Sequence, residues 1–137
     1  MSKLKLYEPS FYWHESLHNG HIKKIESLFK DYIEDDNNFN EKAPWKCSVK
    51  TSFTKKGSYQ ELWRKFNGIL IPYLKPFLDE MSIGLDSLVS EGGWVNKYKF
   101  GDSQEVHTHT GTGSILSMVY YHTLNEDDGS EFHFYSA

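Results

Sequence analysis

His107 and His109 are the residues whose types and spacing point most directly to chemistry. On a β-strand, side chains two positions apart lie on the same face, about 6.6 Å from each other. Two imidazoles at that spacing can converge on one ion, and imidazole suits iron, zinc, copper and nickel alike. A Gly-Asp turn at 101–102 precedes the pair, and a glycine-rich loop at 111–113 follows it. We therefore predict a catalytic metal site at the mouth of a β-barrel, with both histidines as ligands.

A third ligand is expected from elsewhere in the chain. Glu105 lies on the same strand face as the two histidines, but four strand residues put it roughly 13 Å from His109, too far to share one ion. Asp102 lies in the turn and is not a better candidate for the third ligand than Glu105. Of the two downstream histidines, His122 fits an ordinary strand residue, and His133 is the candidate third ligand.

A second pattern, His14-Glu15-Ser16-Leu17-His18, matches the H-E-x-x-H signature of zinc metalloproteases. That chemistry requires both histidines on one face of a sustained helix, with the glutamate as general base. Asn19-Gly20 would end such a helix at once, so we interpret the pattern as a chance match and keep the protease only as a distant alternative.

Two helices are expected in the first part of the chain. Apolar residues at helical spacing mark residues 21–34 as an amphipathic helix. A second helix is predicted to begin at Ser58, which forms a capping-box pattern with Glu61. Pro72 and Pro76 are expected to kink or divide it, because each lacks a backbone donor.

Strands are expected at residues 46–53, 94–99 and 114–124, around His107 and His109, and from residue 131 onward. Helices followed by antiparallel strands predict an α+β fold. We expect a single domain over 1–137, in which 1–90 form a helical support region and 91–137 form the first strands of the barrel. The last strand barely begins before Ala137, so the chain is expected to be C-terminally truncated.

The composition argues against several classes of partner. The net charge is −4, and no long basic run suggests a nucleic-acid partner. No apolar stretch is long enough to span a bilayer or to form a signal peptide. The single Cys47 suits a reducing compartment, so we expect a cytoplasmic protein. The exposed strand edges of an open half-barrel predict homodimerisation.

Residues 91–135 resemble the compact 2-oxoglutarate- and iron(II)-dependent oxygenases that are frequent in marine phages and bacteria. The resemblance rests on Trp94-Val-Asn-Lys-Tyr98, Gly101-Asp102, Gln104-Glu-Val-His107-Thr-His109 and Leu116-Ser-Met-Val-Tyr-Tyr121. It implies a double-stranded β-helix (jelly roll) fold, and a phage-encoded member would act in the host cytoplasm.

The resemblance also implies a cofactor and a reaction. His107 would be the first iron(II) ligand and His109 the second, a position that is commonly a carboxylate in the wider superfamily. Iron, dioxygen and the co-substrate 2-oxoglutarate would hydroxylate a C–H bond of an unidentified substrate, a protein side chain or a small molecule. Asn96 and Tyr98 share one strand face, Ser117 and Tyr121 share another, and we expect these four residues to bind the cofactor.

The chain departs from the family pattern in its second half. The family carries a distal histidine and then an arginine that anchors 2-oxoglutarate, whereas the only arginine here is Arg64, in a predicted helix. His133 follows His109 more closely than the family's distal ligand would. A cupin-like metal-binding barrel without oxygenase activity, and an inactive remnant that serves as an interaction module, are therefore the alternatives.

Overall fold

A computed structural model describes residues 13–40, 46–105, 107 and 116–123. Its first helix, α1, spans Asn19–Glu34 and confirms the helix predicted at 21–34. The apolar stripe buries Ile25, Phe29 and Tyr32. At its start, the Nδ1 atom of His18 accepts a hydrogen bond from the Gly20 backbone N–H at 3.3 Å. A histidine therefore satisfies one of the unpaired donors that every helix N-terminus presents.

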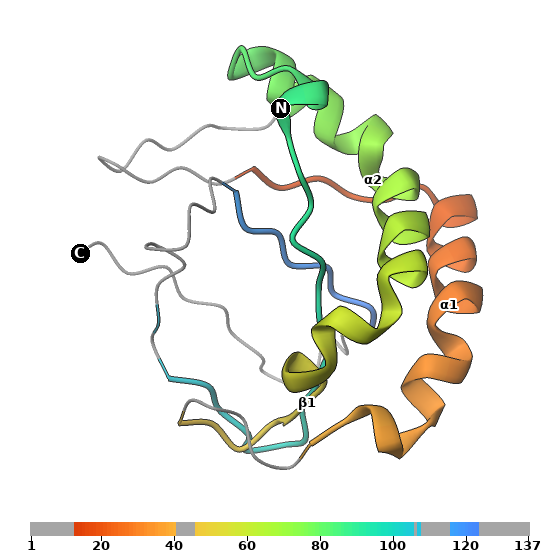
Figure 1. Cartoon of the computed structure of the whole chain (residues 1–137), viewed down its shortest axis with the longest axis vertical. Helices are drawn as coiled ribbons and strands as arrows, with labels where there is room; N and C mark the ends of the chain where they lie inside the picture. The colour runs from red at the N-terminus through yellow and green to blue at the C-terminus, as the bar shows by residue number, and fades with distance from the viewer. Residues whose placement is uncertain (1–12, 41–45, 106, 108–115, 124–137) are drawn as a thin grey trace.

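The second helix, α2, spans Gln60–Glu80 and follows a 3₁₀ segment, η2, at Phe53–Tyr59. The predicted N-cap at Ser58 is wrong by one residue, since Tyr59 is the N-cap and makes no side-chain capping bond. Both Pro72 and Pro76 lie inside the helix, which is not divided, although its ribbon curves along its length in Figure 1.

An aromatic core joins the two helices. The Phe29 ring of α1 lies 5.2 Å from the Trp63 ring and 5.4 Å from the Phe66 ring of α2, centroid to centroid. Such tilted and edge-on ring pairs contribute about 0.5–1.5 kcal/mol each beyond the area they bury. The buried members of this cluster are Ile25, Phe29, Tyr32, Phe39, Trp63, Phe66 and Leu70.

A small antiparallel sheet lies beside the helices. Strand β1 (Lys50–Thr51) pairs with β2 (Asn96–Lys97), so the strands predicted at 46–53 and 94–99 are present but shorter. Thr51 is fully buried, and its backbone N–H and carbonyl both bond Asn40, whereas the bond toward the β2 side comes from the next residue, whose Ser52 N–H donates to the Val95 carbonyl at 3.0 Å. Strand β1 therefore has β2 on one side and the isolated bridge to Asn40 on the other.

The pairing continues past β2 with a change of register. Lys50 opposes Lys97, so an unbroken ladder would place Cys47 opposite Phe100, but Cys47 opposes Gln104 instead. Four residues are therefore taken up by the predicted turn at 100–103, which the structure confirms. Gly101 has a φ of 82°, a left-handed conformation that favours glycine.

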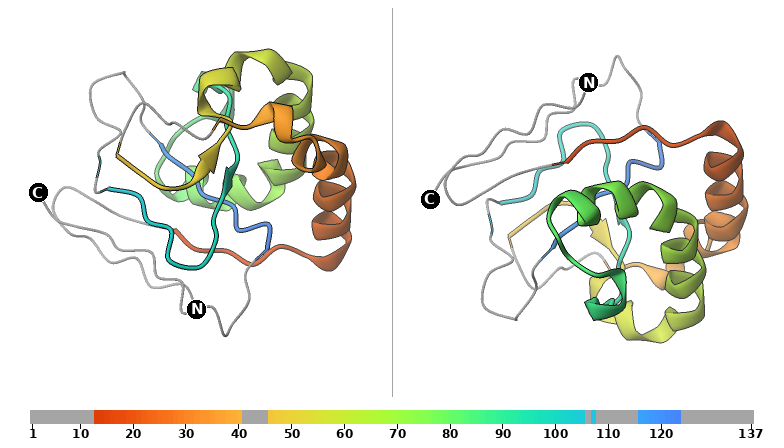
Figure 2. Two further views of the ribbon diagram at one scale, coloured as in Figure 1. Left: turned by 90° about the horizontal axis from the view of Figure 1, so that it is seen from below. Right: turned by 90° about the horizontal axis from the view of Figure 1, so that it is seen from above.

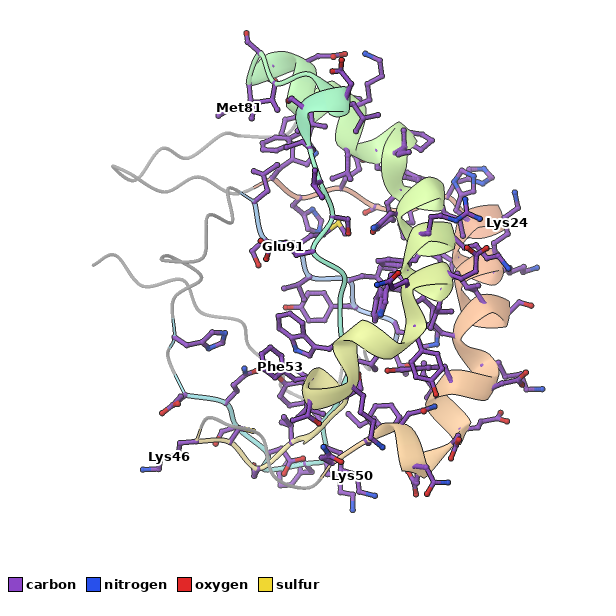
Figure 3. All side chains as sticks on the ribbon, in the orientation of Figure 1. Lys24, Lys46, Lys50, Phe53, Met81 and Glu91 are labelled. Atoms are coloured by element: carbon purple, nitrogen blue, oxygen red, sulfur yellow. The ribbon has the colours of Figure 1, made fainter. Side chains whose placement is uncertain are left out.

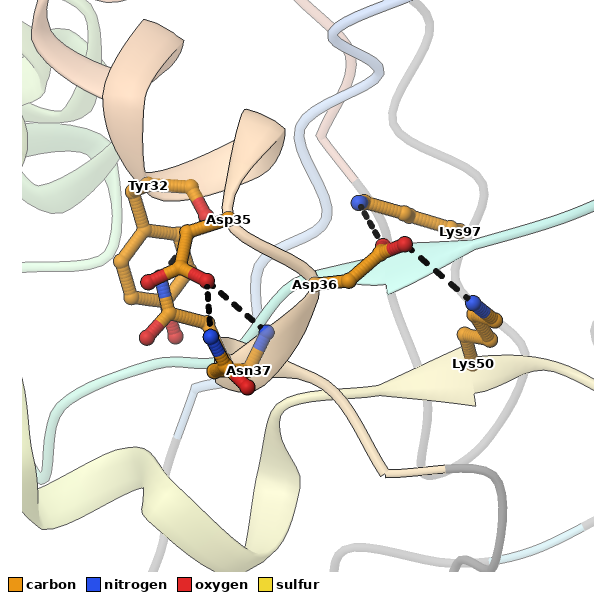
Figure 4. A network of polar contacts seen from close by, with 7 residues as sticks. Tyr32, Asp35, Asp36, Asn37, Lys50 and Lys97 are labelled. Carbon is orange, nitrogen blue, oxygen red and sulfur yellow. Dashed lines mark hydrogen bonds and ion pairs between the residues drawn. The ribbon is translucent and has the colours of Figure 1, made fainter.

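The junction between α1 and the sheet is a polar network (Figure 4). Two short 3₁₀ segments, η1 (Asp36–Asn38) and η3 (Leu85–Ser87), follow the helices. In η1, the Asp36 carboxylate lies 3.2 Å from the Lys97 ammonium of β2 and 3.7 Å from the Lys50 ammonium of β1. One acidic side chain therefore links the end of α1 to both strands.

The described part of the chain has a helical side and a strand side (Figures 1 and 2). Helices α1 and α2 lie together at one side and the strands at the other, and residues 116–123 cross the molecule toward the helices, where the Tyr120 ring lies 5.7 Å from the Phe66 ring of α2. The described residues 116–123 contain no strand, so the strand predicted at 114–124 is wrong for that part. No helix in the described ranges combines the length and the apolar character that crossing a membrane requires.

Candidate metal centre

The segment that leads to His107 is held against the chain before β1. The Ser48 N–H donates to the Ser103 carbonyl at 3.1 Å, and the Ser103 N–H donates to the Ser48 hydroxyl at 3.0 Å. Further along, the Glu105 N–H donates to the Lys46 carbonyl at 3.1 Å. These bonds position the backbone up to two residues before the histidine. Figure 3 labels Lys46 on the side of the molecule away from the helices.

His107 is exposed, and its Nδ1 atom lies 2.9 Å from the carbonyl oxygen of Glu105. A carbonyl oxygen only accepts, so Nδ1 carries the hydrogen of this bond. In the neutral ring, Nε2 then holds the lone pair. Metal-binding histidines are commonly oriented in this way, with the second ring nitrogen bonded to a carbonyl or carboxylate.

Asn96 and Tyr98, two of the predicted cofactor-binding residues, form a polar row with Gln104. The Tyr98 hydroxyl donates to the Gln104 side-chain oxygen at 2.9 Å. Burial raises the pKa of the Tyr98 phenol, and the Asn96 side chain, within hydrogen-bonding reach, acts in the opposite direction. The buried side-chain oxygen of Asn96 has no hydrogen-bond partner among the described residues. A buried acceptor without a partner is costly unless a ligand or water satisfies it.

The other two predicted cofactor-binding residues, Ser117 and Tyr121, are both exposed. Tyr121 is close enough to Tyr98 for its charge to raise the pKa of that phenol. Their neighbour Tyr120 points the other way, because its ring lies 5.7 Å from the Phe66 ring of the helical core. The structure therefore brings Asn96, Tyr98 and Tyr121 into one region, whereas nothing that it shows links Ser117 to them.

The acidic residues near His107 are engaged elsewhere. The Glu105 carboxylate accepts the Lys46 N–H at 3.0 Å, and the Asp102 carboxylate accepts the Lys99 N–H at 2.7 Å within the turn. His122 lies beside α1, in a hollow that Lys23 and Glu26 also line. These positions agree with the exclusion of all three residues as ligands.

His109 and His133 lie outside the described residues, so their predicted roles as ligands stay predictions. Within the described ranges, no three His, Cys, Asp or Glu side chains are grouped so that they could hold one metal ion. Arg64 is bonded twice to Glu61 on α2, at 2.8 and 2.7 Å, and does not reach toward β2.

The H-E-x-x-H residues do not form a helix. His14 and Glu15 precede α1 in a segment without regular secondary structure, and His18 is the N-cap of that helix. The two histidines therefore do not share a helical face, the geometry that the zinc-protease alternative requires. The motif has a structural role instead, because His18 caps α1.

Sequence reasoning assigned no role to Gln104 and Cys47. Gln104 bonds Tyr98 and pairs with Cys47, and both contacts depend on the four-residue change of register. The only sequence signal for this change is the Gly101-Asp102 turn, which predicts a reversal of the chain but not its pairing. No family model, no curated protein and no solved structure matches the chain.

Proposed function

We propose that this chain is a 2-oxoglutarate- and iron(II)-dependent dioxygenase of the hydroxylase type, with His107 and His109 as iron ligands. The observation that carries the proposal is the bond between His107 Nδ1 and the Glu105 carbonyl, which in the neutral ring leaves the lone pair of Nε2 available to a metal. The family resemblance of residues 91–135 supplies the identity of the metal and of the co-substrate.

The described residues fit the first ligand of such a site. Glu105 is itself anchored to Lys46 through both its backbone and its side chain, so the carbonyl that orients His107 is held in place. Precise placement of a ligand by an outer partner is typical of protein metal sites. When bound, iron with 2-oxoglutarate and dioxygen would supply the oxidant for hydroxylation of a C–H bond.

Two uncharged side chains are our candidates for contacts with the co-substrate. Arg64 is paired on α2, so a bidentate guanidinium clamp is not formed by it. The Tyr98 hydroxyl and the Asn96 amide lie together near the segment that carries His107. Rotation of the Asn96 amide by about 180° would place its NH₂ group where its unpartnered buried oxygen now lies. A carboxylate would accept hydrogen bonds from that NH₂ group.

The test is an anaerobic titration with ferrous iron and then 2-oxoglutarate, monitored by the visible charge-transfer band of their chelate. Wild type, His107→Ala and the control His122→Ala are compared. We expect the band in wild type and His122→Ala and its loss in His107→Ala. Iron binding that depends on His107 without the band would support the cupin-like alternative. Iron binding that is unchanged in His107→Ala would refute the proposed centre.

A further inference from the structure

A groove runs between α1 and α2, on the helical side of the molecule. Its volume is about 390 Å³, at the small end of the range for ligand sites. Figure 3 labels Lys24 of this groove beside the two helices, across the molecule from Lys46 and the segment that leads to His107. The groove is therefore separate from the candidate metal centre.

The charged side chains that line the groove are all basic. Lys24 comes from α1 and Lys65 from α2, and His21 adds an imidazole ring. Lys65 lies 3.8 Å from Glu61, but the same carboxylate makes the two shorter bonds to Arg64. In a chain of net charge −4, two lysines from different helices in a groove whose lining has no acidic side chain are complementary to an anion.

The rest of the lining is apolar and includes a glycine without a packing role. Leu28, Ile69 and Pro72 provide apolar surface, and Gly68 lies in the middle of α2. A Cβ atom at Gly68 would meet no other atom within 4 Å, so no neighbour requires glycine there. Glycine inside a helix costs about 1 kcal/mol relative to alanine. The glycine keeps space open in the groove at a cost in helix stability.

His21 is held in position by Tyr73 of α2. The His18 N–H donates to the Tyr73 hydroxyl oxygen at 2.8 Å, and the same hydroxyl lies 2.7 Å from the Nδ1 atom of His21. If the Tyr73 hydroxyl donates its hydrogen to Nδ1 of His21, the neutral His21 ring carries its own hydrogen on Nε2, which is then a donor. The two aromatic rings meet edge to face, with centroids 5.5 Å apart. A groove residue is thus fixed by the packing of both helices.

We infer that this groove binds a small organic anion that has a short apolar body. Lys24, Lys65 and His21 would contact the anionic group, and the apolar body would lie over Gly68 against Leu28, Ile69 and Pro72. The positive charges of Lys24 and Lys65 favour an anion over a neutral or cationic molecule. The space over Gly68, where no side chain lies, would receive a slender apolar body. This inference does not depend on metal binding at His107.

The test is a titration of the ¹⁵N-labelled chain with hexanoate, followed by backbone amide shifts. Hexanol and hexylammonium, which have the same apolar body, are titrated in parallel. We expect saturable shifts around His21, Lys24 and Gly68 with hexanoate, weaker shifts with hexanol and none with hexylammonium. The double variant Lys24→Gln/Lys65→Gln should bind hexanoate about tenfold more weakly, because two charge-assisted contacts are lost.

Two further variants separate the groove from general surface effects. Lys30→Gln/Lys23→Gln removes the same charge from the other hollow along α1 and should leave hexanoate binding unchanged. Gly68→Leu places a helix-favouring side chain over the floor and should abolish binding while α2 stays folded by circular dichroism. Equal binding of hexanoate and hexylammonium, unchanged binding in Lys24→Gln/Lys65→Gln or in Gly68→Leu, or the absence of saturable shifts would each overturn the inference.

Discussion

Two glycines show how the surroundings of one residue decide the effect of the same substitution. At Gly93 an added Cβ would lie 2.8 Å from two ring carbons of Trp63, which is 7% exposed and packed in the core. At Gly68 the added atom would meet nothing. Gly93→Ala should therefore lower the free energy of unfolding by about 1–3 kcal/mol through overpacking. Gly68→Ala should raise it by up to about 1 kcal/mol through helix propensity.

Urea denaturation of the two variants beside wild type measures both effects. Both substitutions replace glycine by alanine, so the change in the conformational entropy of the unfolded chain contributes about equally to the two free energies of unfolding. Equal shifts in the same direction would show that the contact between Gly93 and Trp63 does not constrain the core.

At the residue scale, sequence reasoning was most useful where the pattern was local. The alternation of residues 94–99 predicted that Asn96 and Tyr98 lie on one face, and the structure places Asn96 beside Tyr98, whose hydroxyl bonds Gln104. The contact with Gln104 could not be predicted, because a register change depends on which strand the segment pairs with and not on the segment's own residue types. The ligand roles of His109 and His133 remain predictions.

At the scale of elements, Asp36 predicts how the junction between α1 and the sheet responds to acid. The hydrogen bond from Lys97, with the nearby charge of Lys50, holds the pKa of the Asp36 carboxyl below its ordinary value. The unfolded chain then binds this proton more readily than the folded chain does. The stabilisation is present above the ordinary aspartate pKa of about 3.9 and is lost as the pH falls through the lower folded value.

Thermal unfolding of wild type and Asp36→Asn from neutral to acidic pH checks this junction. The Tm of wild type should fall more steeply below about pH 4 than that of the variant, because only wild type has this carboxylate to protonate. Asp31→Asn, an exposed site on α1, is the control and should follow wild type. Parallel profiles for wild type and Asp36→Asn would contradict the role of the network.

The elements also show why helices were easier to predict than their ends and the strands. The stripe from Ile22 to Ile33 depends on residues one turn apart, so α1 could be read from the sequence. The capping-box pattern failed because Phe53–Tyr59 already form a 3₁₀ segment and Arg64 takes the Glu61 carboxylate. The apolar run predicted a strand at 114–124, yet the described residues 116–123 form none, and Met118 and Val119 are 47% and 57% exposed.

At the scale of the whole molecule, the strand side leaves large apolar side chains in contact with solvent. Phe100, at the turn, is fully exposed, and Tyr98 and Tyr121 are each more than half exposed. Together with Met118 and Val119, these side chains come from segments 98–100 and 118–121, outside the two helices. Exposed apolar surface of this kind favours association, because covering it removes about 25 cal/mol per Å² of contact with water.

Sedimentation velocity over a wide range of protein concentration tests the homodimer that the sequence predicted. We expect the sedimentation coefficient of wild type to rise with concentration and that of Phe100→Ser/Val119→Ser to stay at the monomer value. Leu85→Ser, a matched apolar-to-serine change in η3, removes a side chain that is 40% exposed and should associate like wild type. If Leu85→Ser also stays monomeric, association depends on general hydrophobicity and not on the strand side. If wild type is a monomer at every concentration, these side chains do not form a self-association surface, and the expected homodimer is wrong.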